Sequence, residues 1–545
     1  MTRRTMMRTL ASAMAAAGAS SAAPATPQRK IAKGIFKPTW DSLKQYKTPD
    51  WFRDAKFGIW AHWSAQCVPE QGDWYARQMY IQGNAQYNFH VKQYGHPSKF
   101  GFMELDNLWK AEKWDPEALM ARYVKAGAKY FVSLANHHDN FDNYASTHHA
   151  WNSVKVGPKK DIVGTWAKIA RKHGLRFGVS NHSAHSWHWF QTAYAYDPEG
   201  EQKGVRYDAY TLKKADGKGK WWEGLDPQDL YNGPSMVMPD GITTIRAAQQ
   251  WHEQNDRKWT EAPPAQNPKF VERWFLRCAE LMDKYDPDLV YFDNTELPLG
   301  QAGLDIAAHY YNGNIKRRGR LEAVLNSKEL KPDHVGTMVL DIERGRADHI
   351  LADPWQTDTC IGEWHYRRTI FEQHRYKTAR TVIQTLADIV SKNGNLLLSI
   401  PLRGDGSIDE DESKFIEGLE SWMPVNGEAI FGTRPFKLYG EGGQDLRGTG
   451  NFNEGRGRAY TSKDIRFTTK GDVLYAIVLA WPDDGKVTIE SLAQGKSEFP
   501  KQVGQVELLG AAGPLPFERQ AGGLVVTLPS VKPNEFAYVL KIRTA

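Results

Sequence analysis

The sequence predicts an α/β fold, a (β/α) TIM-like barrel, followed by a C-terminal antiparallel β-sandwich domain. Predicted strands and helices alternate from residue 56 to residue 400, which is typical of a parallel sheet covered by helices. Polar and aromatic residues follow nearly every predicted strand, at the edge where barrels carry their functional loops. After residue 427 the pattern changes to short alternating runs between Gly, Pro and Asp turns, which indicates a separate all-β unit.

The composition is that of a globular chain. It has 545 residues, 41% of them apolar and 25% charged, which is enough for a barrel and a second domain. The net charge is +6 and the basic residues are dispersed, so neither a nucleic-acid partner nor a membrane partner is predicted. The 20 Trp and 23 Tyr residues suit a sugar-binding cleft, although aromatic side chains also fill cores.

Residues 1–28 are predicted to be an export signal and linker. Arg3-Arg4 and Arg8 precede a weakly apolar run over 10–19, and the small residues at 20–23 suit a cleavage site. The twin arginine indicates the Tat route of bacteria, so we expect an exported protein, periplasmic or secreted. The run is too short to span a membrane. The alternative is a disordered tail.

Two domains follow, a barrel over 29–432 and a sandwich over 433–545. The regular strands of the barrel are predicted at 56–63, 129–134, 176–180 and 289–292. Helices are predicted from Asp115 to Gly127, over 161–173 and over 270–284. The sandwich strands are predicted at 464–468, 473–479, 486–490, 505–509, 523–528 and 537–542.

The later barrel units are less regular. Strand candidates lie at 321–325 and 349–351, a helix at 381–392 and a closing strand at 395–400. The segment 184–265 is too long for an ordinary loop, so we expect it to wall the pocket. No Gly-rich phosphate loop follows the first strand, which argues against a nucleotide-binding sheet.

Asp293 is the first candidate for chemistry. The strand 289–292 ends on it, and a carboxylate at the C-terminal end of a barrel strand lies among the loops that form the pocket. Capping of the next turn is an equal alternative for Asp293. Retaining glycosidases use two carboxylates about 5–5.5 Å apart, one as nucleophile and one as acid/base.

Glu343 and Glu363 are the candidates for the second carboxylate, because both lie on later barrel loops. Glu296 is so close to Asp293 in sequence that we expect it to cap a turn instead. An acid/base needs a raised pKa, so Arg344 and Arg346 are expected to point away from Glu343. The alternative is that Glu343 only pairs with these arginines in a surface loop.

Histidines are numerous near the predicted strand ends, but a metal site is not favoured. His137 and His138 are adjacent and would point to opposite sides of an extended backbone, which suits different hydroxyls of one sugar. Three more crowd the start of the long insertion, namely His182, His185 and His188. The His-x-His pair often found on a first barrel strand is missing, since His62 stands alone.

The cysteines show neither metal-ligand spacing nor a disulfide framework. Cys278 lies on the apolar face of its predicted helix and is expected to be inert core. Cys67 and Cys360 follow predicted strands and are expected to be unpaired thiols, a disulfide between them being the alternative in an oxidising compartment.

Several motifs resemble the α-L-fucosidases of glycoside hydrolase family 29. They are WFRDAKFGI at 51–59, HW at 62–63, KAGAKY at 125–130, HHD at 137–139, DPDLVYFD at 286–293 and ADIVSKNGNLLL at 387–398. The resemblance extends from about residue 37 to residue 542. It implies a (β/α) barrel followed by a β-sandwich, a retaining mechanism and no cofactor.

The resemblance also implies roles for individual residues. Asp293 matches the nucleophile and Glu343 the acid/base, with Glu363 as its rival. The positions expected to contact the sugar or pack on it are His62, Asp73, Trp74, His137, His138, Asn181, Tyr291, Trp355 and Trp364.

Three of these positions depart from the family pattern. Asp73 stands where many members carry Glu, Tyr291 where Trp is common, and Asn181 within a strand end that usually contains Tyr.

The predicted substrate is therefore a fucosylated oligo- or polysaccharide from which a terminal α-L-fucosyl unit is removed. The alternatives are an α-L-galactosidase, a non-catalytic carbohydrate-binding homologue and, least favoured, a metal-dependent barrel hydrolase. The glycosidic linkage and the oligomeric state are not predicted.

Overall fold

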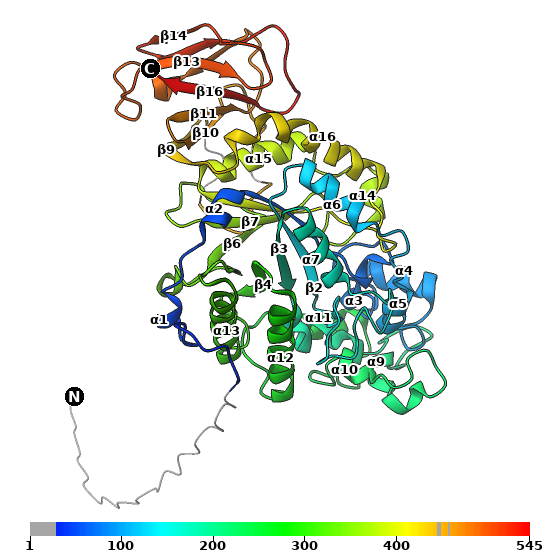
Figure 1. Ribbon diagram of the computed structural model, residues 1–545. Helices are drawn as coiled ribbons and strands as arrows, with labels where there is room; N and C mark the ends of the chain where they lie inside the picture. The colour runs from blue at the N-terminus through cyan, green and yellow to red at the C-terminus, as the bar shows by residue number, and fades with distance from the viewer. Residues whose placement is uncertain (1–28, 444–447, 456–457) are drawn as a thin grey trace, which may run out of the picture.

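The computed structural model describes residues 29–443, 448–455 and 458–545, so the predicted export signal lies outside the described residues. Its centre is a closed barrel in which parallel strands follow one another in chain order (Figure 1). The strands are β1 (Phe57–Ala61), β2 (Tyr130–Asn136), β3 (Arg176–Asn181), β4 (Leu289–Thr295), β5 (Val324–Lys328), β6 (Val339–Glu343), β7 (Trp355–Cys360) and β8 (Gly394–Ser399). Strand β8 pairs with β1 and closes the barrel.

The barrel strands are buried on both faces, which explains their continuous apolar runs. Every residue of β1, β2 and β8 is buried. Strand β4 begins with four apolar residues and continues through Asp293. Parallel strands covered by helices contact only protein, so an alternating polar face is not needed.

The helices of the barrel domain begin where the capping signals predict. The side chain of Asp115 accepts a hydrogen bond from Ala118 N, and that of Asp161 accepts one from Gly164 N. The helices are α1 (Trp40–Leu43), α2 (Asp50–Ala55), α3 (Tyr75–Gln78), α4 (Ala85–Tyr94), α5 (Phe102–Leu108), α6 (Pro116–Lys125), α7 (Ile162–Lys172), α12 (Pro268–Tyr285), α13 (Gln301–Arg318), α14 (Arg368–Glu372), α15 (Ala379–Ser391) and α16 (Glu410–Asn426).

The strand prediction was wrong between β5 and β7. The candidate at 349–351 lies in a loop, and β6 and β7 were not predicted. No α-helix separates β5 from β6 or β6 from β7, so the alternation that identifies βα units is absent there. Buried Asp341 and Asp358 also interrupt the apolar pattern of these two strands.

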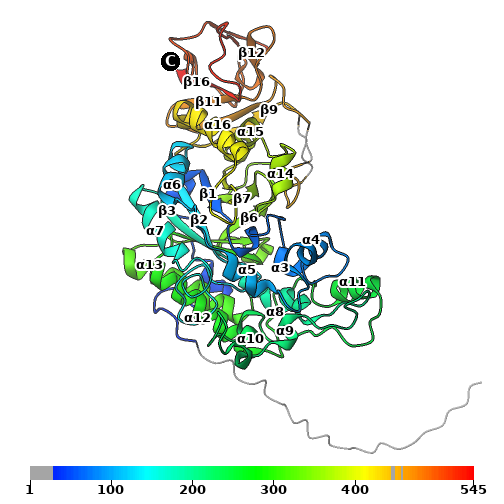
Figure 2. The ribbon, with the colours of Figure 1, turned by 90° about the vertical axis from the view of Figure 1, so that its right-hand side faces the viewer.

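The second domain has two antiparallel sheets that enclose their own apolar core. One has the order β13-β16-β11-β10-β9 and the other β12-β15-β14. Their strands are β9 (Arg434–Glu441), β10 (Ile465–Lys470), β11 (Val473–Val478), β12 (Lys486–Ile489), β13 (Val503–Leu508), β14 (Phe517–Gln520), β15 (Gly523–Thr527) and β16 (Tyr538–Thr544). Helices α15 and α16 lie between the barrel and this sandwich (Figure 2). The predicted fold class is confirmed.

The segment 184–265 extends from the barrel as short helices beside α3, α4 and α5 (Figure 1). Its α-helices are α8 (Ser186–Trp189), α9 (Asp208–Thr211), α10 (Pro227–Leu230) and α11 (Ile245–Gln254).

Cys67, Cys278 and Cys360 are free and buried. Within the described part of the chain, none of the helices has the length and apolarity required to cross a bilayer.

Candidate active site

A pocket of about 100 Å³ lies at the C-terminal ends of the barrel strands. It is lined by Trp60, His62, Trp74, His137, His138, His182, Trp259, Tyr291, Asp293, Lys328, Glu343, Asp358 and Trp364. Strands β1 to β7, or the residues that directly follow them, supply most of these side chains. A larger cavity of about 680 Å³ lies where α15 meets the sandwich, but both leading candidate carboxylates line the small pocket.

Lys328, at the end of β5, joins these two carboxylates. Its Nζ contacts Asp293 Oδ1 and lies 2.5 Å from Glu343 Oε2. Because one ammonium contacts both, the nearest oxygens of the two carboxyl groups lie within about 5 Å of each other, as the separation of about 5–5.5 Å in retaining glycosidases requires. The pair therefore has the spacing of a nucleophile and an acid/base.

Asp293 is held in its ionised form. Burial by itself would raise the pKa of this carboxyl, but Lys328 and the imidazole of His182 outweigh burial and hold the pKa well below its usual range. His182 Nδ1 and His138 Nε2 lie 3.1 Å and 3.2 Å from Asp293 Oδ2. An ionised carboxylate in this position is available as a nucleophile.

Lys328 is the main counter-charge of Asp293. His138 Nδ1 lies 2.6 Å from His182 O, and since a carbonyl can only accept, this nitrogen must carry the His138 proton. A charged bond to Asp293 would need a second proton on Nε2. Burial opposes that second proton and lowers the pKa of His138 to about 4.

Glu343 is in the opposite state. Burial raises the pKa of its carboxyl, Lys328 opposes that rise, and the neighbouring Asp358 and Asp293 add to it, so that the pKa reaches about 7. A carboxyl that retains its proton near neutral pH can act as a general acid.

Arg344 and Arg346 point away from Glu343, as predicted. Arg344 Nε donates to Glu454 Oε1 at 2.8 Å. Arg346 Nη1 donates to Tyr460 Oη at 2.8 Å. Neither guanidinium therefore lowers the pKa of the adjacent carboxyl.

Glu363, the rival acid/base, lies outside the pocket lining. Its Oε2 accepts from Asp73 N at 3.2 Å and its Oε1 pairs with Arg367 at 2.7 Å. This pairing with an arginine gives Glu363 the environment of a structural carboxylate.

Asp73 was expected to bind the sugar, but the structure gives it a different position. Its Oδ1 accepts from His365 N at 2.7 Å and its Oδ2 from Trp364 N at 3.3 Å. The carboxylate therefore holds the loop that presents Trp364 to the pocket. The adjacent Trp74 lines the pocket, as expected.

The prediction for Asn181 was wrong, because its side chain faces helix α12. Asn181 Nδ2 lies 3.5 Å from Cys278 Sγ, and its Oδ1 accepts from Ser183 N and Oγ. Neighbouring residues at a strand end point to opposite sides, so His182 faces the pocket instead.

The prediction for Trp355 was also wrong. Trp355 is the first residue of β7, so it lies at the end of the barrel opposite the pocket. Its ring is buried and its Nε1 donates to Lys392 O at 2.8 Å. The error follows from the missed strand β7.

Four further sequence-predicted residues converge on the pocket as expected: His62, His137, His138 and Tyr291. Tyr291 Oη donates to Asp358 Oδ2 at 3.1 Å. The insertion contributes Trp259, which packs on His185 with ring centroids 3.7 Å apart. Trp259 is the residue through which the segment 184–265 lines the pocket.

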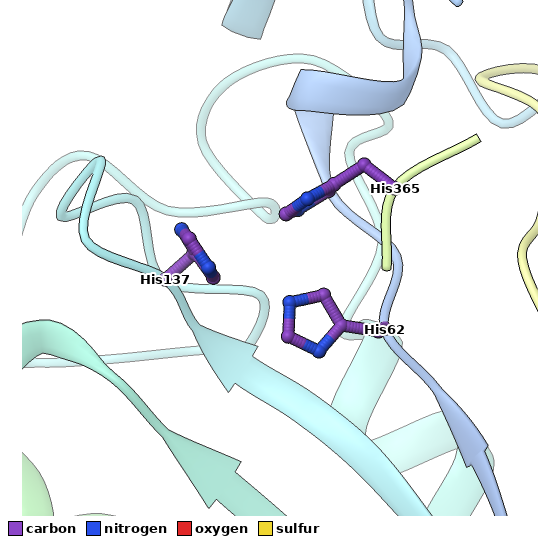
Figure 3. A group of neighbouring side chains, drawn as sticks. All are labelled: His62, His137 and His365. Atoms are coloured by element: carbon purple, nitrogen blue, oxygen red, sulfur yellow. The ribbon is translucent and has the colours of Figure 1, made fainter. Parts of the chain in front are cut away.

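His62, His137 and His365 turn their rings toward a common space, and their nitrogens lie close enough to consider a metal (Figure 3). His137, His138 and His182 form a second such group. Gln66 Oε1 accepts from Ala76 N, so its amide NH₂ must face His137 Nδ1, 2.9 Å away.

His137 therefore accepts at Nδ1 and carries its proton on Nε2. A metal-binding imidazole needs the reverse, a free lone pair toward the ion and an N–H toward its support. Burial and the neighbouring imidazoles lower the pKa values of His62 and His137 well below their usual range. Neutral imidazoles of this kind suit the hydroxyls of a sugar.

Several pocket residues were not predicted, Lys328 and Asp358 above all. The position of Lys328 at the end of a strand could have marked it as a pocket residue. Its partners Asp293 and Glu343, however, lie 35 and 15 residues away in sequence. Asp358 lies within the unpredicted strand β7. Trp60 and Trp259 were noted only as part of the general excess of tryptophan.

An eight-stranded barrel with two closely spaced carboxylates of opposite protonation defines the class of the protein as a glycoside hydrolase. Comparison with known sequences gives the family. The family model described as alpha-L-fucosidase matches residues 24–428, and the alpha-L-fucosidase C-terminal domain matches residues 459–543. The chain belongs to the alpha-L-fucosidase family.

Individual relatives agree with this assignment. Tissue alpha-L-fucosidase of Homo sapiens is 25% identical over 538 residues, which cover 96% of this chain and 94% of that protein. The Rattus norvegicus enzyme is 25% identical over 528 residues, covering 94% and 93%. The crystal structure of Thermotoga maritima alpha-fucosidase in complex with fucose is 25% identical, has a TM-score of 0.66 and covers 93% of this chain and 100% of that chain.

Proposed function

We propose that this protein is a retaining, exo-acting α-L-fucosidase with Asp293 as nucleophile and Glu343 as acid/base. The observation that carries the proposal is the pair of carboxyl groups that Lys328 bridges, of which Asp293 has a lowered pKa and Glu343 a raised pKa. The pocket of about 100 Å³ is well below the range of pockets that enclose larger ligands, so it suits one terminal sugar of a fucosylated oligo- or polysaccharide.

In the first step the Asp293 carboxylate attacks the anomeric carbon, and the bond from that carbon to the leaving oxygen breaks. Glu343 gives its proton to that oxygen, so the leaving group departs as a neutral alcohol. The product is an ester between the Asp293 carboxyl and the sugar. The neutral imidazoles of His62 and His137 face the sugar and can exchange hydrogen bonds with its hydroxyls.

In the second step Glu343 takes a proton from water, whose oxygen attacks the anomeric carbon and releases Asp293. The pair is suited to this reversal. The negative charge of Asp293 raises the pKa of Glu343, and that charge is absent from the ester. The pKa of Glu343 therefore falls in the intermediate, and Lys328 stabilises the ionised base.

An α-L-galactosidase is less well supported. Of the three departures from the family pattern, Asp73 and Asn181 lie outside the pocket lining, and only Tyr291 lines the pocket. A panel of aryl α-L-fucoside and α-L-galactoside measures this directly. We expect turnover of the fucoside, and turnover confined to the galactoside would contradict the proposed substrate.

The acid/base role is tested by Glu343→Ala. We expect a loss of about 10²–10⁴-fold in rate on substrates with poor leaving groups and a smaller loss on activated aryl fucosides, which need little protonation. Azide should restore turnover of the aryl substrate and yield a fucosyl azide of retained configuration.

Glu363→Ala is the matched control, because Glu363 lies outside the pocket lining and pairs with Arg367. It should show neither leaving-group dependence nor azide rescue. If Glu363→Ala shows both effects and Glu343→Ala shows neither, the acid/base role belongs to Glu363.

We further propose that residues 1–28 direct export of the bacterial protein, on the basis of the twin arginine and the Ala-rich run. Replacing Arg3 and Arg4 by lysine should leave the protein in the cytoplasm of a bacterial host, as judged by fractionation. Unchanged export of this variant would contradict a twin-arginine route.

A further inference from the structure

We propose that Phe452, outside the barrel, forms the platform on which the leaving-group sugar stacks. This inference rests on the proposed function of Glu343. It concerns the segment 448–455, which lies between β9 and β10 in sequence and returns to the ends of the barrel strands.

The segment is joined to the acid/base by direct hydrogen bonds. Phe452 N donates to Glu343 O at 2.8 Å, and Glu343 N donates to Asn451 Oδ1 at 2.8 Å. Asn451 Nδ2 donates to Glu329 Oε1 at 3.1 Å. Residues 451 and 452 therefore cover the ends of β5 and β6, the two strands that present Lys328 and Glu343.

The residues that follow hold the segment rigidly. Arg346 N donates to Asn453 Oδ1 at 2.9 Å, and Asn453 Nδ2 donates back to Arg346 O at 3.1 Å. Glu454 N donates to Arg344 O at 3.0 Å, and its carboxylate pairs with Arg344 and Lys377. These hydrogen bonds, together with those of Asn451, hold the backbone of Phe452 in place.

Phe452 is the exposed aromatic residue of this segment. Its relative exposure is 60%, whereas that of Asn453 beside it is 5%. Its φ is 55°, in the left-handed region, which costs free energy for a residue with a Cβ. Non-glycine residues held in this backbone region cluster at active sites and ligand clamps.

The location decides what the ring would bind. A general acid protonates the oxygen of the departing group, so residues beside Glu343 lie on the leaving-group side of the pocket. Phe452 lies outside the pocket lining, and its backbone N–H bonds to Glu343 O, so the residue is adjacent to the acid/base on the outer side of the pocket. The ligand class is a neutral pyranose, whose C–H face packs on an aromatic ring.

The test measures kcat/KM of the Phe452→Ala variant on substrates whose leaving group contains a ring and on one whose leaving group does not. The substrates are α-L-fucosyl fluoride, 4-nitrophenyl α-L-fucoside and 2′-fucosyllactose. We expect kcat/KM to fall about tenfold for the two ring-bearing substrates, as for loss of one stacking contact, and to stay unchanged for the fluoride. Phe452→Trp should retain the wild-type values.

Val531→Ala is the control for loss of an exposed apolar side chain, since Val531 is 76% exposed in the sandwich. Unchanged kcat/KM for all three substrates in Phe452→Ala would overturn the proposal. An equal loss on all three, or a moved alkaline limb of the pH profile, would show that Phe452 acts through Glu343. If the wild type hydrolyses none of the substrates, it is the proposed function that fails.

Discussion

At the scale of the residue, the proposed reaction depends on how Lys328 affects the pKa values of Asp293 and Glu343. Lys328 lowers the pKa of both Asp293 and Glu343, while burial raises both. The two carboxyl groups differ because the imidazole of His182 faces Asp293, whereas acidic Asp358 and Asp293 itself face Glu343. The same pocket therefore holds one carboxylate and one carboxylic acid.

This difference predicts the pH profile of kcat/KM. Glu343 must be protonated to act, so activity is present below its pKa and should fall as the pH rises through about 7. Asp293 must be ionised, and its lowered pKa places the acid limb well below the usual range of an aspartate. Glu343→Gln should remove the alkaline limb measured with fucosyl fluoride. A limb that persists in this variant would have to belong to another group.

Lys328→Met tests the bridge itself. Without the ammonium both carboxyl pKa values rise, so both limbs of the pH profile should move to higher pH. We also expect kcat to fall by about 10²–10³-fold, as for loss of one electrostatic contact at a reacting centre.

Lys331→Met is the matched control, because the Lys331 side chain is 71% exposed and pairs with Glu296 away from the pocket. It should leave both limbs in place. Limbs that stay fixed in Lys328→Met as well would show that this lysine does not set the two pKa values.

At the scale of the element, the sequence predicts strands well where helices separate them. Strands β1 to β4 and β8 were predicted within a few residues, because each is a buried apolar run with a predicted helix before or after it. Strands β6 and β7 lack both signals, since polar residues interrupt them and no α-helix connects them. Misplacing Trp355 and missing Asp358 both follow from this gap.

The site was predictable to the extent that its residues follow predicted strands. His62, His137 and Asp293 meet this condition, and all three line the pocket. The direction in which a side chain points at a strand end was not predictable. A shift of one residue decides whether Asn181 or His182 faces the pocket, and the structure places His182 there. The bridge by Lys328 required the strand order, because β5 pairs with both β4 and β6 and so lies between the two carboxyl groups.

At the scale of the whole molecule, a buried charge cluster joins the barrel domain to the sandwich. Asp388 on α15 contacts Arg466 of β10 at 2.6 Å and Lys392 at 2.9 Å. Burial alone would raise the pKa of Asp388, but these cations and Arg346 hold it well below its usual range. The stabilisation from Asp388 is therefore present at neutral pH and is lost as the pH falls.

Asp388→Asn should reduce the free energy of unfolding by about 3–5 kcal/mol, because it leaves buried cations without their counter-charge. Denaturant unfolding measures this loss. Asp472→Asn, whose side chain is 86% exposed in a surface pair with Lys501, should change it by less than about 1 kcal/mol. Equal effects of the two variants would contradict the role of Asp388 at the domain junction.

The central claim, that Asp293 is the nucleophile of a retaining fucosidase, is tested most directly by trapping the covalent intermediate. A 2-fluorinated fucosyl reagent slows release of the sugar more than its attachment, so the ester accumulates and can be located by peptide mass spectrometry. We predict a single fucosyl adduct on Asp293 and none in Asp293→Asn. An adduct on any other carboxylate would contradict the assignment.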